Sequence, residues 1–325
     1  MKARDFKGLL KAIGELSLGQ KQRLKEELDG ASDEAAVLSL IEGDGRAEHH
    51  CPGCNGQQLY RWGRMKGLQR YRCRACGKTF TALTGTPLAR LRHRDQWLHY
   101  AHALQEGVSI RAAAMRCGIA KNTSFKWRHR FLQQPACEKA HVLQGIVEAD
   151  ETFFLESFKG RRHLPRPARH RGGNAAKRGT SAEQIPVLVV RDRYEQTADF
   201  RLSGTAAQDI EPILQPLLAP DAVLCTDGAA AYKIIARHAG IAHRPVNIAG
   251  GVRVLAGVYH IQNVNAYTSR LKGWMDRFHG VATRYLDNYL GWRRMLECLH
   301  ADNLPLAYLA LALGQHVHFQ QQNAT

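Results

Sequence analysis

Hydrophobic residues spaced three or four positions apart predict helices in the first part of the chain. They recur in this way between positions 9 and 28, which predicts one or two short amphipathic helices over residues 1–45, with a break near the stretch DGASDE. The same spacing returns over residues 97–132. There Gly107 and Gly118 divide the segment into three predicted helices, and Ser109 is placed to cap the second. The pattern therefore predicts two separate helical regions.

Beyond residue 143 the pattern changes to that of strands. Four short stretches combine alternating or continuous hydrophobic positions with turn residues at their ends: GIVEADETFFL, IPVLVVRD, TADFRL and DAVLCTDG. Helical spacing is found over residues 205–218, 228–238 and 258–300. Strands followed by helices of these lengths predict a mixed α/β domain.

The high positive charge of the chain favours a negatively charged binding partner. With 46 Lys and Arg against 29 Asp and Glu, the net charge is +17 and the isoelectric point is about 9.8. This balance favours a polyanion, nucleic acid first, over a basic protein whose charges are merely solvated. No apolar run approaches the ~20 residues of a membrane span, and the N-terminus lacks a signal-peptide pattern. We therefore expect a cytoplasmic protein whose cysteines are thiols or metal ligands.

One segment, residues 157–182, has the composition of an exposed loop. It carries eight Lys or Arg, no acidic residue and many Gly, Pro and small residues, so it is predicted to form a mobile loop between the first two strands. The loop is either a solvated insertion or an arm that neutralises phosphates, and the net charge favours the arm. The residues expected to contact DNA are Lys159, Arg161, Arg162, Arg169, Arg171, Lys177 and Arg178.

Two C-x2-C pairs predict a zinc ribbon over residues 46–86. The four cysteines are Cys51, Cys54, Cys73 and Cys76, with 18 residues between the pairs. At this spacing four thiolates from two turns form a tetrahedral zinc site, and a redox-active pair of dithiols is the alternative. Between the pairs, basic residues are interleaved with aromatic ones, which favours contact with nucleic acid. The stretch from residue 61 to residue 74 contains Arg61, Arg64, Lys66, Arg70, Arg72 and Arg74, of which Arg61, Arg64, Lys66 and Arg70 are predicted to bind DNA.

The three predicted helices of residues 97–132 have the order of a helix-turn-helix. The third helix is expected to present Lys126, Arg128 and Arg130 on its exposed side. Phe125 and Trp127 are available for packing. In a helix-turn-helix the last helix enters the major groove of DNA, so these basic residues are predicted to bind DNA. An ordinary three-helix bundle is the alternative.

Two aspartates stand where a sheet can present them to a ligand. Asp150 lies inside an apolar strand, where a charge is costly unless it is paired or bound to a metal. Asp227 follows a short apolar strand and precedes Gly228, a position at which α/β sheets often bind ligands. Two such carboxylates can hold divalent metal, and Mg²⁺ suits oxygen ligands. An Asp before a Gly is also a common turn residue, which is the alternative.

The order and wording of the motifs resemble a known family. The relevant segments are the N-terminal helical segment, the paired cysteines, GIVEADET, the basic arm, LCTDGAAAY and YHIQNVNAYTSRLKGWMDRFHG. Together they resemble prokaryotic insertion-sequence transposases of the DDE superfamily, in which a zinc ribbon precedes an RNase H-like catalytic domain. The resemblance covers nearly the whole chain. It implies that Asp150 and Asp227 are the first two catalytic aspartates.

The resemblance also assigns two residues on the last long helix. Asn265 stands where the superfamily usually has a glutamate that completes the metal site, and Lys272 follows seven residues later, as in a branch with the signature D, D, N, K. Seven residues are about 10 Å of helical rise and nearly the same helix face. The amide would then bind Mg²⁺ or Mn²⁺ with Asp150 and Asp227, and the ammonium would bind a phosphate. A decayed site, or a capping amide beside a surface lysine, are the alternatives. Glu148, Glu151 or Glu156 is a candidate to supplement the neutral ligand.

These inferences combine into a predicted organisation. It comprises an N-terminal helical segment (1–45), the zinc ribbon (46–86), a helix-turn-helix-like segment (87–140), an RNase H-like α/β domain with a mixed sheet flanked by helices (141–300) and a C-terminal tail (301–325). The expected function is a transposase that cleaves element ends and joins the 3′-hydroxyl to target DNA by two-metal phosphoryl transfer. We expect a structural zinc ion, double-stranded DNA as the partner, and a dimer or larger assembly. A DNA-binding regulator without catalysis, or a nuclease that does not join ends, are the alternatives.

Overall fold

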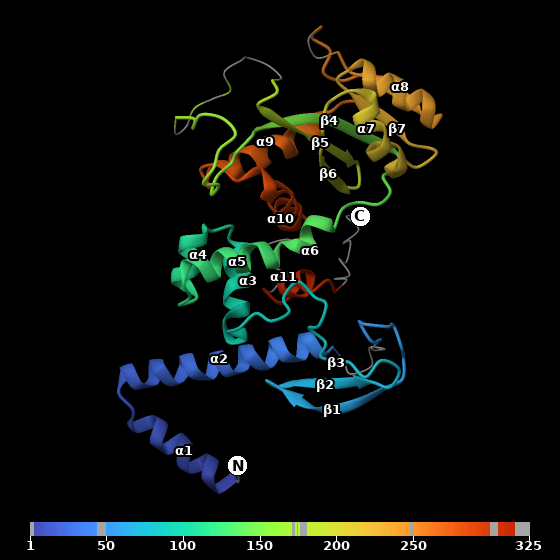
Figure 1. Ribbon diagram of the computed structural model, residues 1–325. Coiled ribbons are helices and arrows are strands. Elements are labelled where there is room, and N and C mark those ends of the chain that lie inside the picture. Colours follow the sequence, from blue (N-terminus) through green and yellow to red (C-terminus); the bar gives the residue numbers. More distant parts are fainter. Residues whose placement is uncertain are drawn as a thin grey trace. The chain divides into compact units, whose positions relative to one another are not determined.

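The computed structural model describes residues 3–43, 50–170, 173, 175, 181–247, 250–299 and 305–315 (Figure 1). The chain forms two compact units, residues 1–131 with 299–325, and residues 132–298. The five-part division predicted from the sequence is finer than these units and stays a prediction. Within the described ranges, no helix is both long and apolar enough to span a bilayer.

The first unit begins with helices α1 (Ala3–Glu15) and α2 (Leu18–Glu42). The predicted break near DGASDE is wrong, because α2 is continuous through that stretch and the break lies before it, at Ser17. Ser17 and Gln20 form a capping box, in which each side chain accepts the other residue's backbone N–H, and this starts a new helix. Val37 and Ile41 are buried and fix the second half of α2, which offsets the cost of about 1 kcal/mol for Gly30 in a helix.

A three-stranded antiparallel ribbon follows, with β1 (Leu59–Met65), β2 (Leu68–Cys73) and β3 (Thr79–Phe80). Lys66 and Gly67 both have positive φ, which is the geometry of a tight hairpin turn that matches the twist of the two strands. Tyr71 and Phe80 stack beside Cys51 and Cys73 to make a small core.

The helices of the first unit pack around aromatic residues. These helices are the short η1 (Arg94–Gln96), α3 (Trp97–Gln105), α4 (Ile110–Arg116), α5 (Lys121–Phe131) and α11 (Pro305–Ala312). Trp97, Tyr100 and Trp127 are buried, and the Tyr100 and Trp127 rings meet edge to face at 5.2 Å. Ser109 accepts the Ala112 N–H at 3.3 Å and caps α4, as predicted.

The second unit is built on a five-stranded mixed sheet. Its strands are β4 (Ile146–Leu155), β5 (Gln184–Asp192), β6 (Thr197–Arg201), β7 (Val223–Thr226) and β8 (Ala242–Pro245), in the spatial order β6-β5-β4-β7-β8. The first three strands pair antiparallel, whereas β4, β7 and β8 run parallel. This confirms the predicted α/β class with a mixed, RNase H-like sheet. Strand β8 was not predicted, because it is a four-residue edge strand without hydrophobic alternation.

Helices cover both faces of this sheet (Figure 1). On one face lie α7 (Ala207–Leu214), η2 (Gln215–Leu217) and α8 (Ala230–Ala239); on the other lie α9 (Gln262–Asp276) and α10 (Leu286–Cys298), with the short α6 (Gln133–Cys137) and η3 (Thr283–Tyr285). Val147 and Ala149 of β4 pack with Tyr232 of α8. Glu148 instead bonds α9. Because side chains alternate along a strand, Asp150 shares the α9 side with Glu148.

Candidate active site

The pairing of β4 with β7 brings the two predicted aspartates together. Glu148 is opposite Cys225 in this parallel pair, so two further residues along each strand lead to Asp150 and Asp227. Neighbouring strands lie about 4.8 Å apart. Asp227 is exposed at the carboxyl end of β7, where its Oδ1 accepts the Ala229 N–H at 3.0 Å. Gly228 between them has a φ of +92°, which a residue with a side chain rarely adopts.

The pKa of Asp150 also indicates that Asp227 lies nearby. Burial and, to a smaller extent, the charge of Asp227 raise the pKa of Asp150, whereas the Glu151 N–H and the Lys272 ammonium lower it, and the net pKa is about 6. Asp150, Asp227 and Lys272 therefore interact through space. Two carboxylates this close oppose each other's ionisation until a cation neutralises them.

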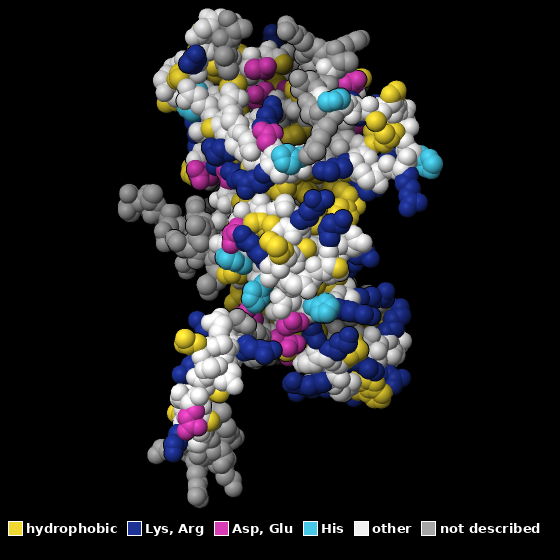
Figure 2. Space-filling model, turned by 90° about the vertical axis from the view of Figure 1, so that its left-hand side faces the viewer, with side chains coloured by type: hydrophobic (Ala, Val, Ile, Leu, Met, Phe, Trp, Pro, Cys, Tyr) yellow, Lys and Arg dark blue, Asp and Glu magenta, His cyan; other side chains and the backbone are white. Residues whose placement is uncertain are grey.

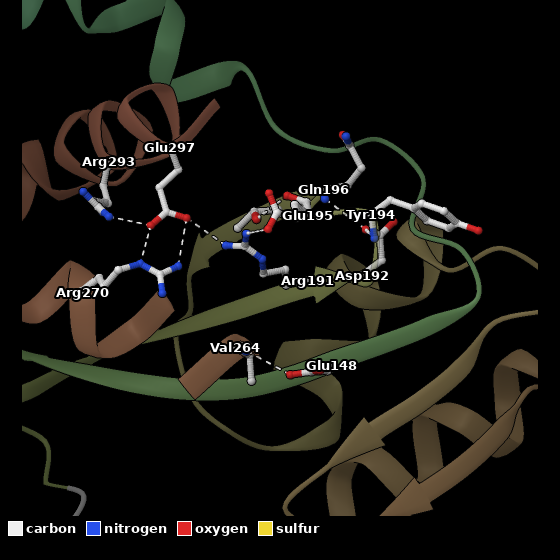
Figure 3. Close-up of polar contacts among 11 residues, drawn as sticks. Glu148, Arg191, Asp192, Tyr194, Glu195, Gln196, Val264, Arg270, Arg293 and Glu297 are labelled. Atoms are coloured by element: carbon white, nitrogen blue, oxygen red, sulfur yellow. Dashed lines mark hydrogen bonds and ion pairs between the residues drawn. The ribbon is translucent and has the colours of Figure 1, made fainter. Parts of the chain in front are cut away.

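Helix α9 supplies the two remaining residues. Its Val264 N–H donates to Glu148 Oε2 at 3.0 Å, which holds the first turn of α9 against β4 (Figure 3). Asn265, the next residue, is half-buried, and Lys272 is exposed two turns later. Carboxylate and amide oxygens are hard donors of the kind that Mg²⁺ and Mn²⁺ prefer, so Asp150, Asp227 and Asn265 are the candidate ligands.

The neighbouring glutamates have protein partners. Glu148 is fully buried and lies 3.1 Å from Arg193 and 3.4 Å from His260. Glu151 faces the opposite side of the sheet, where its Oε1 accepts the Tyr232 hydroxyl at 2.6 Å. Burial also raises the pKa of Glu151. Both side chains are therefore engaged by neighbouring protein groups. Sequence reasoning did not find Arg193, His260 or Tyr232, because each is a single residue without a motif and meets its partner only in the fold.

A cavity of about 1070 Å³ extends from Lys272 along the second half of α9 to the basic insertion. Its lining includes the cationic residues Lys159, Arg161, Arg166, Arg169 and Lys272 and the aromatic residues Phe153, Phe154 and Phe158. Cationic and aromatic groups together suit the phosphates and bases of a nucleic acid strand.

The described start of the insertion, residues 157–170, is held against the connection between α9 and α10. The Thr283 N–H donates to the Ser157 carbonyl at 2.9 Å, and the Ser157 N–H donates to the Thr283 hydroxyl at 2.8 Å. Lys159 Nζ donates to three carbonyl oxygens after α9, the shortest contact being 2.8 Å to Gly280. The composition of this segment predicted a mobile loop. It could not reveal these contacts, because they join residues that are far apart in the sequence.

The four paired cysteines meet in the first unit. Their sulfur atoms all lie within 4.8 Å of one another. Gly56 fits closely here, since a Cβ at that position would lie 3.4 Å from the sulfur atoms of Cys54 and Cys73. Hydrogen bonds to the Cys51 sulfur, first that of the Gly53 N–H and then those of Cys76 and Cys54, outweigh burial and lower the pKa of this thiol to about 7. Four converging cysteine sulfur atoms can hold a tetrahedral zinc ion.

Basic residues of the ribbon are accessible. Arg61, Arg64 and Lys66 are exposed and Arg70 is half-buried. Arg72 lies 4.9 Å over the ring of the exposed Trp62. Figure 2 shows Lys and Arg side chains gathered at the lower right of the surface, at the level of the ribbon, in greater number than acidic ones. The arrangement suits contact with a polyanion.

On α5 the structure corrects the predicted surface. Lys126 is exposed, but Arg128 is fully buried and donates to the Val108 carbonyl at 2.9 Å, so it is not available to DNA. Arg128 lies four residues after Ser124 and one after Trp127, on the face of α5 that packs inward. Arg130 is half-buried and donates to the carbonyls of Pro87 and Ala89. Phe125, predicted to pack, is instead partly exposed.

The predicted DNA contacts of the insertion divide into three groups. Arg161 and Arg162 are exposed. Lys159 is engaged with backbone carbonyls, and Arg169 pairs with Glu183 at 3.1 Å. Arg171, Lys177 and Arg178 lie outside the described residues.

Comparisons with known proteins relate the chain to transposable elements. Residues 142–293 match the sequence profile of the ISXO2-like transposase domain. An uncharacterized protein in transposable element ISH50 of Halobacterium salinarum is 27% identical over 245 residues, which are 74% of this chain and 82% of that protein. The crystal structure of a pre-cleavage Mos1 transpososome was also found, at 12% identity over 68% of this chain and 79% of that one, but its TM-score of 0.20 is too low to compare folds. The residues that match the ISXO2-like transposase domain, 142–293, include Asp150, Asp227, Asn265 and Lys272.

Proposed function

We propose that the chain is a DNA transposase that cleaves the ends of its insertion sequence and joins the freed 3′-hydroxyl to target DNA. The proximity of Asp150 and Asp227, with Lys272 in the same electrostatic environment, carries the proposal. The match of residues 142–293 to a transposase domain supports it, and so does a net charge of +17, which suits a polyanionic substrate. The reaction would take place on DNA in the prokaryotic cytoplasm.

In this proposal each site residue has one task. Asp150, Asp227 and the Asn265 amide oxygen hold the catalytic cations. Mg²⁺ or Mn²⁺ bound there supplies activation of the attacking oxygen and stabilisation of the leaving one. Lys272 holds a phosphate beside the scissile bond. Because Asn265 is neutral, cations bind less tightly than at three carboxylates. No side chain becomes joined to the DNA.

DNA is held by three surfaces in this proposal. A ribbon stabilised by zinc on its four cysteines contacts phosphates through Arg61, Arg64, Lys66 and Arg70. The exposed face of α5 contacts DNA through Lys126. Arg161, which lines the cavity beside Lys272, and the exposed Arg162 guide a strand there. Two element ends have to meet for transposition, so we expect a dimer or larger assembly on DNA.

A strand-transfer assay tests this function. Linear element ends and a target plasmid are incubated with Mg²⁺ or Mn²⁺ and wild-type protein, and joined products are counted. Asp150→Ala and Asp227→Ala should abolish joining while retaining DNA binding in a mobility-shift assay. Asn265→Glu should lower the Mg²⁺ concentration needed for binding at the site.

The neutral Asn265 also favours a second candidate, a DNA-binding regulator whose catalytic site has decayed. Under that reading, wild-type protein binds element ends but yields no cut or joined product with either cation. Cut ends that are never joined to a second duplex would instead identify a nuclease.

A further inference from the structure

The N-terminus of α9 has no capping residue of its own. The first N–H groups of a helix lack partners within it, and a Ser, Thr, Asp or Asn usually supplies an acceptor. Here the residue before the helix is Ile261, whose apolar side chain is buried and accepts nothing. The first turn of α9 contains no acidic residue either. Acceptors must therefore come from elsewhere in the fold.

Glu148 of β4 provides one of these acceptors. Its Oε2 accepts the Val264 N–H at 3.0 Å. A carboxylate at a helix N-terminus is further stabilised by the helix dipole. Glu148 is therefore the cap of α9, although the two are more than a hundred residues apart in sequence.

The other oxygen of Glu148 belongs to a network of charges, although it accepts no hydrogen bond from the described residues. Glu148 Oε1 lies 3.1 Å from Arg193 NH1 and 3.4 Å from His260 Nδ1. Arg193 also contacts His260 Nε2 at 2.8 Å and donates to the Val258 carbonyl at 2.9 Å. A fully buried carboxylate is costly unless it is paired, and here the pairing joins β4, the residues after β5 and the entry to α9.

This network stands between the two halves of the metal site. Asp150 is two residues after Glu148 on the same side of β4, and Asn265 is the residue after Val264. We propose that Glu148 is a positioning residue that sets the distance between the Asn265 amide and the Asp150 carboxylate. The inference rests on the proposed function, because it concerns the cations that Asp150, Asp227 and Asn265 hold there. A neutral ligand gains most from such support, since it attracts a cation less strongly than a carboxylate.

Glu148→Asp tests this role, because it keeps the charge beside Arg193 but is one methylene too short to reach the Val264 N–H. Mn²⁺ binding to the full-length, zinc-loaded protein is measured by water-proton relaxation, without DNA. We expect Glu148→Asp to raise the dissociation constant for Mn²⁺ about tenfold, as Asn265→Ala does. In an Asn265→Ala background the same change should raise the dissociation constant by less than about a further twofold. A residue that acts by positioning the Asn265 amide has little effect once that amide is gone.

Glu297→Gln is the matched control, because Glu297 also bonds α9 but does so at Arg270, remote from Asn265. It should leave the Mn²⁺ dissociation constant within about twofold of wild type. If Glu148→Asp does not fold, Glu148→Gln takes its place in the same double-mutant cycle. An unchanged dissociation constant, or an equal loss in both backgrounds, overturns the role of Glu148. If Asp150→Ala also leaves Mn²⁺ binding unchanged, the metal site and with it the proposed function fail instead.

Discussion

At the scale of single residues, Asp150 occupies an environment that opposes its own charge. Burial and the neighbouring Asp227 raise the pKa of Asp150 to about 6, and Lys272 offsets this only in part. Such opposition is expected where a cation is to be bound, because the cation then recovers the energy of the unfavourable carboxylate pair. The sequence predicted this residue because it is a charge within an apolar strand. It did not predict that Arg128 is buried, since the inward face of α5 depends on which helices surround it.

Asp150→Asn should stabilise the metal-free protein at neutral pH. A carboxyl whose folded pKa lies above its unfolded value binds more protons in the folded state, so wild type loses stability as pH rises from about 4 to about 6. Asparagine removes this loss and can still accept the Glu151 N–H. We expect a gain of about 2 kcal/mol at pH 8 that vanishes near pH 4.

Urea unfolding of zinc-loaded protein without Mg²⁺ or Mn²⁺, at pH 4, 6 and 8, measures this gain. Asp221→Asn, a change at an exposed site away from the sheet edge, is the control. A gain that does not depend on pH would contradict the explanation.

At the scale of elements, α9 is held to the sheet at separate points along its length. Near its start it bonds Glu148, and farther along Arg270 donates to Glu297 of α10, which also binds Arg191 of β5 and Arg293 (Figure 3). The helices and strands themselves were predictable from their hydrophobic spacing, because β4, β5 and β7 are long apolar runs or end in turn residues. The contacts that fix α9 were not predictable, because they join single polar residues from distant segments.

Glu297→Gln should weaken the attachment of α9 and lower stability. Burial alone raises the pKa of Glu297, but hydrogen bonds from Arg270 and Arg191 outweigh it and bring the pKa to about 2. The stabilisation is therefore complete above the unfolded pKa of Glu and is lost as pH falls toward 2. Allowing for partial exposure, we expect a loss of about 2 kcal/mol at pH 7.

Thermal and urea unfolding at pH 7 and pH 3 will show this loss. The difference between the variant and wild type should shrink at pH 3, where the carboxylate begins to protonate. Equal destabilisation at both values would mean that the charge of Glu297 is not what matters.

At the scale of the whole molecule, the two candidate sites belong to different compact units of the chain. The first unit contains the cysteine cluster and the exposed basic ribbon, and the second contains the aspartate pair. Spacing predicted the cysteine cluster because ligand pairs are local in sequence. The contribution of residues 305–312 to the first unit was not predicted, since a short apolar helix gives no indication of its partner.

Zinc removal should affect the first unit selectively. We expect one zinc ion per chain by atomic absorption, and its loss on chelation or in Cys73→Ser. The ribbon has only a small core of its own, so residues 50–86 should become sensitive to protease while residues 132–298 stay resistant. Cys137→Ser, which changes an exposed cysteine outside the cluster, should leave the zinc content unchanged.

Arg64→Ala should reduce the salt dependence of DNA binding. If Arg64 neutralises one phosphate, the slope of log K against log salt concentration should fall by about 0.9, with a similar effect on all DNA sequences. Fluorescence anisotropy between 50 and 200 mM salt measures the slope. Arg23→Ala, an exposed change on α2, is the control, and an equal effect of both would point to net charge alone.

The two ends of the basic insertion are fastened to each other, which makes the insertion a place where the sequence can vary. The Glu156 N–H donates to the Glu183 carbonyl at 2.8 Å, so the chain leaves and re-enters the sheet at adjoining points. Because the two ends are fastened to each other, loops of other lengths and sequences can be exchanged between them with little cost in closure entropy. Grafting a foreign loop across this junction should therefore leave the strands bearing Asp150 and Asp227 in register and, under the proposed function, change which DNA is engaged.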